Sequence, residues 1–459
     1  MRISTENTRF RKKNALPLPF FASLCLNSCP EVRNSTSMSD QIASQPSCAD
    51  PFDPASISLD EALRRIAERV QPVHACERLP IRECLDRVNH EIVSSPSNVP
   101  PHANSAMDGF ALAVASLQQD GITEFEQIGT AYAGNAFEGS VSAGQCVRIM
   151  TGGLIPQGAD AVIMQEQTEV TAEGKVRIDA NHRVGENIRE AGEDIKQGAA
   201  VIDAGVRLSP ADLGVLASLG IAQLQVKRKP VVAFFSTGDE LMPVGEPLAP
   251  GKIYDSNRYC LHGMLSRMAV DIVDLGVVRD EPQAMREALE NAAAKADLIL
   301  STGGVSVGEA DFIKPALEEI GSTEFWKIAI KPGRPLTLGQ IDASIFIGLP
   351  GNPVAVMVTF SQFVVPAIQA LAGTRPTRPK LFKARADDRL RKKPGRYEFQ
   401  RGIATLDETG EWRVGKTGKQ GSGILTSMSR ANCFIVLPDD NAGVEPGDEV
   451  SIQFFDWSL

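Results

Sequence analysis

Apolar residues at helical spacing mark the first regular element of the chain. Ser58 and Glu61 stand three positions apart, the spacing of a capping box, which predicts a helix start at Ser58. The apolar positions behind it fall on one helical face as far as Pro72: Leu59, Leu63, Ile66 and Val70. We therefore expect this helix to pack against a later part of the chain.

Two different patterns follow. From about 94 to 197, short alternating apolar segments such as CVRIM and AVIMQE lie between glycine-rich turns, which predicts a mostly β domain. Ser209 then stands as a helix N-cap, Pro210 as the first helical residue and Gly220 just past the end. These three residues predict a short connecting helix.

The pattern changes again from Pro230 to Gly373, where buried strand-like runs alternate with helical segments. The runs are VVAFFS, DIVDLGVV, DLILST and IFIGL, the last followed by a long helix. This alternation predicts a mainly parallel, doubly wound sheet. After Pro376 the segments become short, polar-alternating and rich in turns, which predicts a small β barrel or sandwich.

The fold class is therefore a multidomain protein of α/β and β parts. We expect a loose extension over 1–55, an N-terminal helix over 56–75 that packs with the α/β domain, and a helical/β connector from 76–93 and 198–220. The remaining parts are a β domain over 94–197, a doubly wound α/β domain over 221–378 and a C-terminal β domain over 379–459.

Composition narrows the classes of function. A net charge of -10 argues against broad electrostatic binding to nucleic acid or to an anionic membrane. Eight scattered cysteines fit a reduced cytoplasmic protein, and five histidines without metal-binding spacing disfavour a zinc or iron site. No run of about 18 apolar residues is evident, so we expect no membrane-spanning helix. Among metal sites, one that holds a hard cation by oxygen ligands remains possible.

The first residues need a separate interpretation. Between Arg9 and Pro30 a basic segment precedes an apolar one, as in a secretory signal. Prolines and a missing small-residue cleavage site speak against a signal. We expect a leader without regular structure, or a true start at Met38.

Three loops that follow the predicted buried strands combine glycine with polar side chains. They are Ser236–Glu240, Ser301–Asp311 and Pro350–Pro353. In open parallel sheets, ligands bind beyond the carboxyl ends of the strands, and glycine-rich loops direct backbone N–H groups at anions. Acidic residues on the same rim would repel an anion unless Mg²⁺ bridged them: Glu240, Asp280, Glu309 and Asp311. The same acids equally fit helix caps and solvated loops.

Other candidate segments are ambiguous when each is taken singly. The segment Lys331–Pro335, preceded by Lys327, fits either a phosphate grip or a surface turn. Asp108 in SAMDGF fits a carboxylate site or an ordinary turn, and REAGED fits a structural ion pair. The residues from Arg389 to Arg401 are rich in basic side chains, and a run of like charges usually forms a solvated face. The chain has no HExxH motif, which removes support for a metalloprotease function.

Taken together, the motifs carry a family resemblance. SAMDGFA, RIMTGG, GADAVIMQEQTE, NIREAGEDI, FSTGDEL, IYDSNRY, STGGVSVGEADF, IKPGRPL and GLPGNPV occur in order over about 400 residues. This set resembles the molybdopterin molybdenumtransferases, the bacterial MoeA-type proteins and the carboxyl-terminal part of gephyrin. The resemblance implies a molybdopterin-binding α/β domain and a homodimer whose active site is shared between subunits. It also implies insertion of molybdate into adenylylated molybdopterin, with Mg²⁺ and release of AMP.

The resemblance also implies roles for particular residues. The catalytic set would be Asp108, Thr151, Asp194, Glu240, Asp280 and Asp311, and the metal ligands Glu240, Asp280 and Asp311. Asp108 and Asp194 would arrive from the partner's β domain. The residues that bind or shape the pterin and molybdate site would be Ser301, Gly303, Gly304, Ser306, Gly308, Lys327, Lys331, Arg334, Pro350, Pro353, Arg401 and Ser422.

Three positions depart from the family pattern. Phe110 replaces a usual tyrosine, Asp86 replaces a usual glycine, and Thr302 stands where serine is also common. Two other functions stay open: adenylylation of molybdopterin, whose enzymes resemble the 230–373 region alone, and a non-catalytic molybdopterin-binding scaffold. The additional domains favour insertion. A transient contact with the adenylyltransferase is expected in either enzymatic case.

Overall fold

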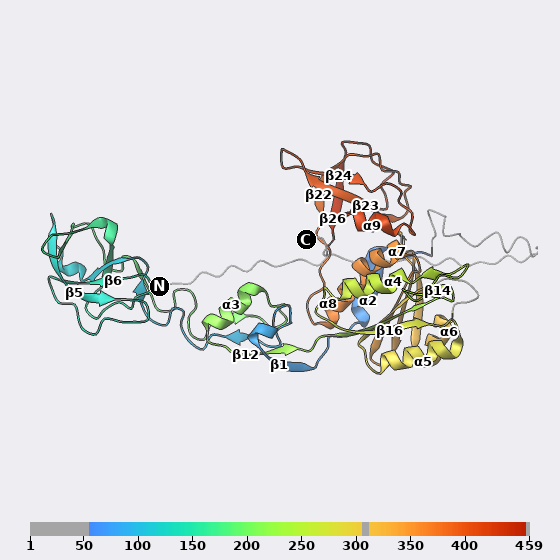
Figure 1. Cartoon of the computed structure of the whole chain (residues 1–459), viewed down its shortest axis with the longest axis horizontal. Coiled ribbons are helices and arrows are strands. Elements are labelled where there is room, and N and C mark those ends of the chain that lie inside the picture. Colours follow the sequence, from blue (N-terminus) through green and yellow to red (C-terminus); the bar gives the residue numbers. More distant parts are fainter. Residues whose placement is uncertain (1–54, 305–311, 456–459) are drawn as a thin grey trace, which may run out of the picture. The chain divides into compact units, whose positions relative to one another are not determined.

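The computed structural model describes residues 55–304 and 312–455 of the chain (Figure 1). The predicted N-terminal extension and the alternative start at Met38 lie outside the described residues. The strands form three six-stranded sheets and several two-stranded ones.

The α/β sheet has the strand order β16-β13-β17-β21-β20-β18. Four neighbouring strands are parallel, as the alternating pattern predicts: β16 (Asp271–Val278), β13 (Val231–Thr237), β17 (Leu298–Thr302) and β21 (Ser344–Leu349). The other edge is antiparallel and consists of β20 (Pro335–Ile341) and β18 (Ser322–Lys327). The sequence pattern did not separate these two strands from the parallel set.

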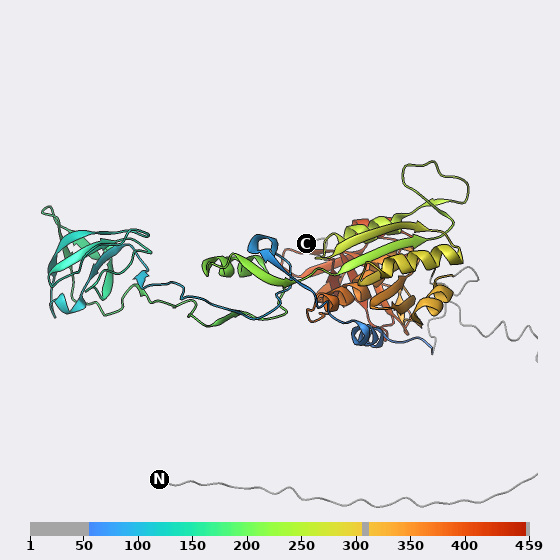
Figure 2. The ribbon, with the colours of Figure 1, turned by 90° about the horizontal axis from the view of Figure 1, so that it is seen from below.

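Helices cover both faces of this sheet (Figure 2). Along β13, Val232 and Phe234 belong to one buried core, while Ala233 and Phe235 belong to another. Because side chains alternate along a strand, a run of apolar residues buries itself on both faces. The first core is covered by α2 (Leu59–Arg69), α4 (Ser256–Leu265), α7 (Pro353–Thr359) and α8 (Val365–Leu371). The second is covered by α5 (Pro282–Ala293) and α6 (Ile313–Ile320).

The predicted N-terminal helix is present as α2. The Ser58 side chain accepts a hydrogen bond from the backbone N–H of Glu61, so the cap forms where the spacing predicted it. Ala62 and Ile66 are buried in the same core as β13. The helix therefore packs against the α/β domain although about 160 residues separate the two in sequence.

The long helix after β21 needs a correction. Pro353–Leu371 is long and apolar enough to cross a membrane by composition, whereas the sequence pattern indicated no such stretch. Most of it is buried in the α/β core, because Val354, Phe363 and Ile368 pack under the sheet. It is a core helix, and a π-helical segment, Phe360–Val364, separates its α7 and α8 halves.

The connector joins strands from two distant segments. β1 (Cys76–Pro80) pairs with β12 (Gln223–Lys227), and β2 (Val93–Ser94) pairs with β11 (Ala200–Ile202). The predicted short helix is α3 (Pro210–Ser218), with Ser209 as its N-cap and Gly220 at a positive φ of 70° beyond its end. The β domain between these segments has the strand order β7-β4-β6-β5-β9-β8. Its strands are β4 (Gly109–Leu112), β5 (Thr123–Ala131), β6 (Gln145–Ile149), β7 (Ala161–Met164), β8 (Thr168–Val170) and β9 (Lys175–Ile178).

The C-terminal strands close into a barrel, which settles the choice between barrel and sandwich. Closure follows because β25 pairs with both β26 and β23. The ring consists of β23 (Tyr397–Leu406), β24 (Trp412–Lys416), β22 (Phe382–Ala386), β26 (Glu449–Phe454) and β25 (Cys433–Leu437). A short strand of the α/β region, β19 (Ile330–Lys331), pairs in parallel with the barrel strand β23.

Candidate active site

The predicted loops meet at the carboxyl edge of the α/β sheet. Thr237 ends β13 and Asp280 follows β16, its parallel neighbour. The Thr237 hydroxyl donates a hydrogen bond to the Asp280 carboxylate. The loop after β13 is therefore joined directly to the residues that follow β16, which ends at the same edge because the two strands are parallel.

The glycines after β17 let a third loop approach. Gly303 has a φ of 87°, and a Cβ atom there would lie 2.5 Å from the backbone oxygen of Thr237. Gly304 has a φ of 62°, and its Cβ would lie 2.6 Å from the Ile313 side chain. Any larger residue at either position would clash and strain the backbone. The two glycines thus bring the β17 loop against the end of β13.

A residue that the sequence analysis did not single out holds this edge together. Asn257 lies in the first turn of α4, and its side-chain amide donates to Thr302 Oγ1 at 3.1 Å and to the backbone oxygen of Gly351 at 2.7 Å. It thereby links the loops after β17 and β21. The motif IYDSNRY contains it, and its position at the start of a helix was the available signal.

Two serine hydroxyls at this edge have no hydrogen-bond partner among the described residues. Ser236 and Ser301 are both fully buried, and the Oγ atom of each is without a partner. Buried polar groups are nearly always hydrogen-bonded, so an unsatisfied pair on adjacent strands is unusual. This pair is consistent with an edge at which a polar ligand binds.

Glu240 is exposed at the turn after β13. Its carboxylate lies over Gly238, where a Cβ atom would come within 2.6 Å of Oε2. Asp280 is half-buried. The predicted third ligand, Asp311, lies outside the described residues, as do Ser306 and Gly308. Within the described ranges, no group of three or more His, Cys, Asp or Glu side chains is placed to hold a metal ion.

The C-terminal barrel contributes a loop to the same edge. The backbone N–H of Val354, in the first turn of α7, donates to the backbone oxygen of Ser422 at 3.1 Å. Arg401 anchors this loop: its Nε donates to the Ser427 hydroxyl and its Nη2 to the backbone oxygen of Gly421, both at 3.0 Å. Burial lowers the pKa of Arg401 to about 10, so it stays charged at neutral pH. Arg401 therefore positions the loop that carries Ser422.

Pro350 and Pro353 frame the turn that this loop contacts. Pro350 is buried, and Pro353 is the first residue of α7. The α7 N-terminus is thus covered by the Ser422 loop.

The basic residues of IKPGRP are distributed over two elements. Lys327 ends β18, and Lys331 in β19 forms an ion pair with the buried Glu398 at 3.1 Å. Arg334 is 7% exposed, with its Nη2 3.5 Å from the Ser56 hydroxyl. In the C-terminal basic group, Lys392 is buried and donates to three backbone oxygens, so it is structural rather than part of a solvated face.

In the β domain, three predicted segments are joined side by side. Asp108 accepts hydrogen bonds from the backbone N–H and the hydroxyl of Thr151, both at 2.7 Å. These two bonds lower the pKa of Asp108, the backbone bond most. β3 (Asn104–Ser105) pairs with β10 (Ile188–Arg189), and the Asp194 N–H donates to the Val99 oxygen at 3.0 Å. SAMDG, MTGG and REAGED therefore form one cluster of loops.

Comparisons with known proteins cover almost all of the described chain. Residues 57–220 match the MoeA N-terminal region (domain I and II), residues 233–370 a probable molybdopterin binding domain, and residues 383–455 the MoeA C-terminal region (domain IV). A molybdopterin molybdenumtransferase from Haemophilus influenzae is 42% identical over 404 residues, which cover 88% of this chain and 100% of that protein. The Bacillus subtilis molybdopterin molybdenumtransferase is 34% identical over 86% of this chain and 93% of its own length.

A solved structure agrees with these matches. The molybdopterin biosynthesis moeA protein from Pyrococcus horikoshii superposes with a TM-score of 0.75 at 31% identity. The superposition covers 87% of this chain and 100% of that one.

Proposed function

Because the chain belongs to the molybdopterin molybdenumtransferases, the transferases of molybdenum cofactor biosynthesis, we propose how its residues perform that reaction. The substrates are molybdate and adenylylated molybdopterin, and the products are molybdenum cofactor and AMP. The observation that carries the proposal is the convergence of four loops at one sheet edge: Asn257 links those after β17 and β21, and the Thr237–Asp280 bond links those after β13 and β16.

The anionic substrates bind where glycine and hydroxyl groups concentrate. Gly303 and Gly304 leave the backbone free to approach a phosphate, and Ser301 offers an unsatisfied hydroxyl. We expect Ser422, whose backbone oxygen contacts α7, to add a hydroxyl, and Lys331, which pairs with Glu398, to contribute a cation. Lys327 and Arg334 belong to the same cationic segment, and Ser306 and Gly308 to the loop after Gly304. Molybdate and the pterin phosphate are held by these groups.

Glu240 and Asp280 supply the carboxylates. Both follow neighbouring strands and offer only oxygen, which is the donor type that Mg²⁺ prefers. Asp311 would complete this ligand set. When bound, Mg²⁺ would neutralise charge between the carboxylates and the substrate phosphates. Thr237 holds Asp280 in place by its hydroxyl bond, so the carboxylate is oriented before substrate arrives.

The β-domain cluster acts from a second subunit. Asp108 is kept ionised by Thr151, and it faces, in a homodimer, the sheet edge of the partner together with Asp194. Asp108 then orients the reacting groups by its negative charge. No separate base is needed to deprotonate it, because the hydrogen bonds from Thr151 already favour the ionised form. The enzyme works in the cytoplasm and contacts the adenylyltransferase only transiently.

The first experiment is molybdenum insertion by the purified protein with adenylylated molybdopterin, molybdate and Mg²⁺. We expect cofactor formation with one AMP released, and a loss of about 100-fold or more for Glu240→Ala. Glu246→Ala is the matched control, because Glu246 is an exposed acid six residues along the same chain segment.

Full activity of Glu240→Ala would remove the carboxylate from the mechanism. Binding of the pterin by the wild type without turnover would reject insertion as the function.

A further inference from the structure

A buried carboxylate lies where the α/β region and the C-terminal barrel are joined. Glu398 is the second residue of β23, and its side chain is 7% exposed. Its partner in the parallel pairing of β19 with β23 is Lys331. The Lys331 ammonium donates to Glu398 Oε1 at 3.1 Å. The strand pairing thus places a carboxylate of the barrel directly against a cation that we expect to bind substrate.

The backbone holds these two residues in register. Ile330, the other residue of β19, is fully buried, and the Tyr397 N–H donates to the backbone oxygen of Ala329 at 2.8 Å. Paired strands lie about 4.8 Å apart, so the side chains of paired residues are close neighbours. The contact between Lys331 and its carboxylate partner therefore follows from the strand pairing and not from a chance side-chain conformation.

A second donor fixes the carboxylate itself. Gln400 lies two residues along β23 and therefore on the same face of the strand as Glu398. Its side-chain amide donates to Glu398 Oε1 at 3.0 Å and to the backbone oxygen of Arg391 at 3.1 Å. Both side chains are buried. Because the carboxylate is held in this way, the more exposed Lys331 adopts the position that Glu398 sets.

The charge of Glu398 also acts on two buried cations of the barrel. Burial lowers the pKa of Lys392, and the charges of Glu398 and of the exposed Asp439 and Asp440 oppose that shift. Burial likewise lowers the pKa of Arg401, and Glu398 again opposes the shift. Glu398 therefore has two possible roles: it positions Lys331, or it only balances the charge of the two buried cations.

Lys331 keeps donors for a ligand. Its side chain is 49% exposed, and Glu398 is its hydrogen-bond partner among the described residues. An ammonium group has more than one N–H donor, so others remain for an anion. A free lysine side chain also loses much rotamer entropy when a ligand orders it. The ion pair with a fixed carboxylate orders Lys331 before the substrate arrives.

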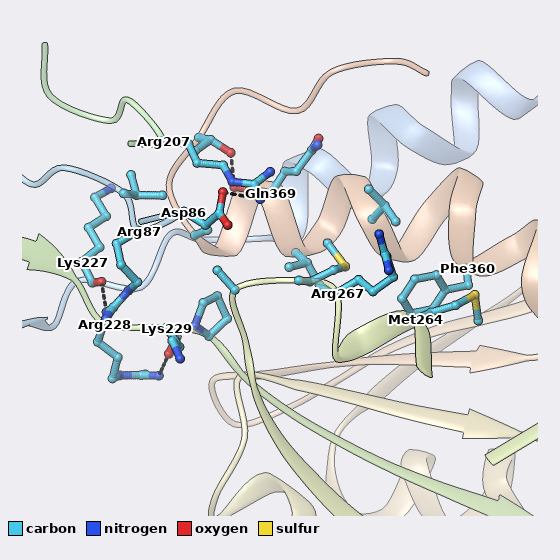
Figure 3. Close-up of a pocket in the computed structure, with 18 of the residues that line it drawn as sticks. Asp86, Arg87, Arg207, Lys227, Arg228, Lys229, Met264, Arg267, Phe360 and Gln369 are labelled. Carbon is cyan, nitrogen blue, oxygen red and sulfur yellow. Dashed lines mark hydrogen bonds and ion pairs between the residues drawn. The ribbon is translucent and has the colours of Figure 1, made fainter. Parts of the chain in front are cut away.

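An ion pair elsewhere in the molecule shows the contrast. Asp86 and Arg207 line a cavity between the connector and the α/β domain (Figure 3). They pair at 2.9 Å, but both side chains are more than half exposed. Water screens such a pair, and it fixes neither side chain firmly. The pair of Lys331 differs because its acidic member is buried and bonded.

We propose that Glu398 is a positioning residue for the insertion reaction, which holds the Lys331 ammonium where an anionic group of the substrate binds. This inference rests on the proposed function, in which Lys331 belongs to the substrate site. Glu398 itself touches no substrate, so its whole effect on the reaction passes through Lys331.

The test is a double-mutant cycle on kcat/KM for insertion. Glu398→Gln keeps the shape of the side chain and removes its charge, and it should lower kcat/KM about tenfold because the binding cation is misplaced. In a Lys331→Ala background the same substitution should have no further effect. Glu398→Asp should lose less than Glu398→Gln, since the charge remains, and it replaces Glu398→Gln in the cycle if that variant does not fold.

The matched control is Glu449→Gln. Glu449 pairs with Lys383 at 2.8 Å in the same barrel, and both side chains are exposed. Loss of this pair removes the same kind of charge from the barrel without a change at the substrate site. We expect kcat/KM to stay at the wild-type value.

A second measurement does not depend on turnover. Acetylation of Lys331 by acetic anhydride, quantified by mass spectrometry of peptides, should be about two- to fivefold faster in Glu398→Gln than in wild type, because the carboxylate no longer holds the side chain. Lys383 is the internal reference and should react equally in both proteins. Equal rates at Lys331 would show that Glu398 does not hold it, which would overturn the proposal.

The activity measurements distinguish this inference from the proposed function. If the wild type inserts molybdenum and Glu398→Gln has an unchanged or higher kcat/KM, the inference fails and the proposed function stands. An equal loss in the Lys331→Ala background would also overturn it, because Glu398 would then act through Lys392 or Arg401. A wild type that binds the pterin without turnover would reject the proposed function, and this inference with it.

Discussion

At the residue scale, Asp108 shows how a turn residue becomes a fixed charge. Thr151 donates its backbone N–H and its hydroxyl to the carboxylate, and both bonds favour the ionised form. A carboxyl group whose pKa is lowered by folding stabilises the fold above its unfolded pKa, and this stabilisation is lost as the pH falls through the folded pKa. The sequence motif alone could not distinguish this arrangement from an ordinary turn.

Removal of the hydroxyl tests this account. Thr151→Val keeps the backbone bond and loses the side-chain bond, so the pKa of Asp108 should rise part of the way to its ordinary range. The titration of the Asp108 carboxyl carbon by NMR measures this, with Thr151→Ser as the control that keeps the hydroxyl. An unchanged pKa in Thr151→Val would assign the whole effect to the backbone.

Two departures from the family pattern have clear local reasons. Phe110 is 2% exposed, and the Arg148 guanidinium lies 4.9 Å from its ring centroid, so this contact uses the ring face and requires no hydroxyl. Asp86 has a φ of 62°, in the region where glycine is favoured and aspartate is among the few tolerated residues. The family's usual glycine at this position is therefore explained by the backbone.

Substitution of Asp86 separates backbone strain from its ion pair with Arg207. Asp86→Ala should lower the free energy of unfolding by about 1–2 kcal/mol, because alanine has no compensating local hydrogen bond at positive φ. Asp86→Gly should stay within about 0.5 kcal/mol of wild type, since the exposed ion pair contributes little. Differential scanning calorimetry measures both. If glycine destabilised as strongly as alanine, the ion pair and not φ would explain the aspartate.

At the scale of elements, the sequence pattern predicted correctly those features that depend on residues close together in the chain. The Ser58 and Ser209 caps and the alternation of buried strands with helices are determined by neighbouring residues, and the structure has them where the patterns placed them. By contrast, Lys331 meets Glu398 only because β19 pairs with a barrel strand 67 residues later. No periodicity in either segment encodes that pairing.

The hydrogen bonds of Asn257 are a second contact that sequence periodicity could not predict, because its partners lie in two other loops. Its amide reaches Thr302 and Gly351, so a change in any of the three alters the spacing of the loops after β17 and β21. A serine at 302 offers the same acceptor, which explains why the family accepts either hydroxyl residue.

We therefore expect Asn257 to be a positioning residue for the insertion reaction. Thr302→Val and Asn257→Ala should each lower kcat about tenfold with little change in KM, because misplacement of loops affects the reacting geometry more than binding. The double variant should be no worse than either single variant. Thr302→Ser should behave as wild type. Additive losses, or an equal loss in Thr302→Ser, would contradict the shared hydrogen bond.

At the scale of the whole molecule, the proposed catalytic residues divide between two parts of the chain. Asp108, Thr151 and Asp194 belong to loops of the β domain, and Glu240 and Asp280 belong to the carboxyl edge of the α/β sheet. The alternating patterns predicted both parts, yet no pattern within one chain states which copy of the β domain serves which sheet. That assignment is a property of the assembly, which depends on surfaces rather than on periodicity.

Mixing of inactive variants decides between a site within one chain and a site shared by two. Asp108→Asn and Glu240→Gln are each expected to be inactive alone. If the site is shared, a mixed dimer contains one site with both residues intact and one with neither, so random reassociation should restore about a quarter of wild-type insertion activity. If the site lies within one chain, every site in the mixture lacks one residue and no activity returns. Two copies of Asp108→Asn carrying different affinity tags provide the control for exchange, because they must form mixed dimers and remain inactive. Recovery of activity would also require that the loops around Asp108 reach the Glu240 edge of the other subunit, which makes the mixing experiment a test of the assembly and of the residue roles together.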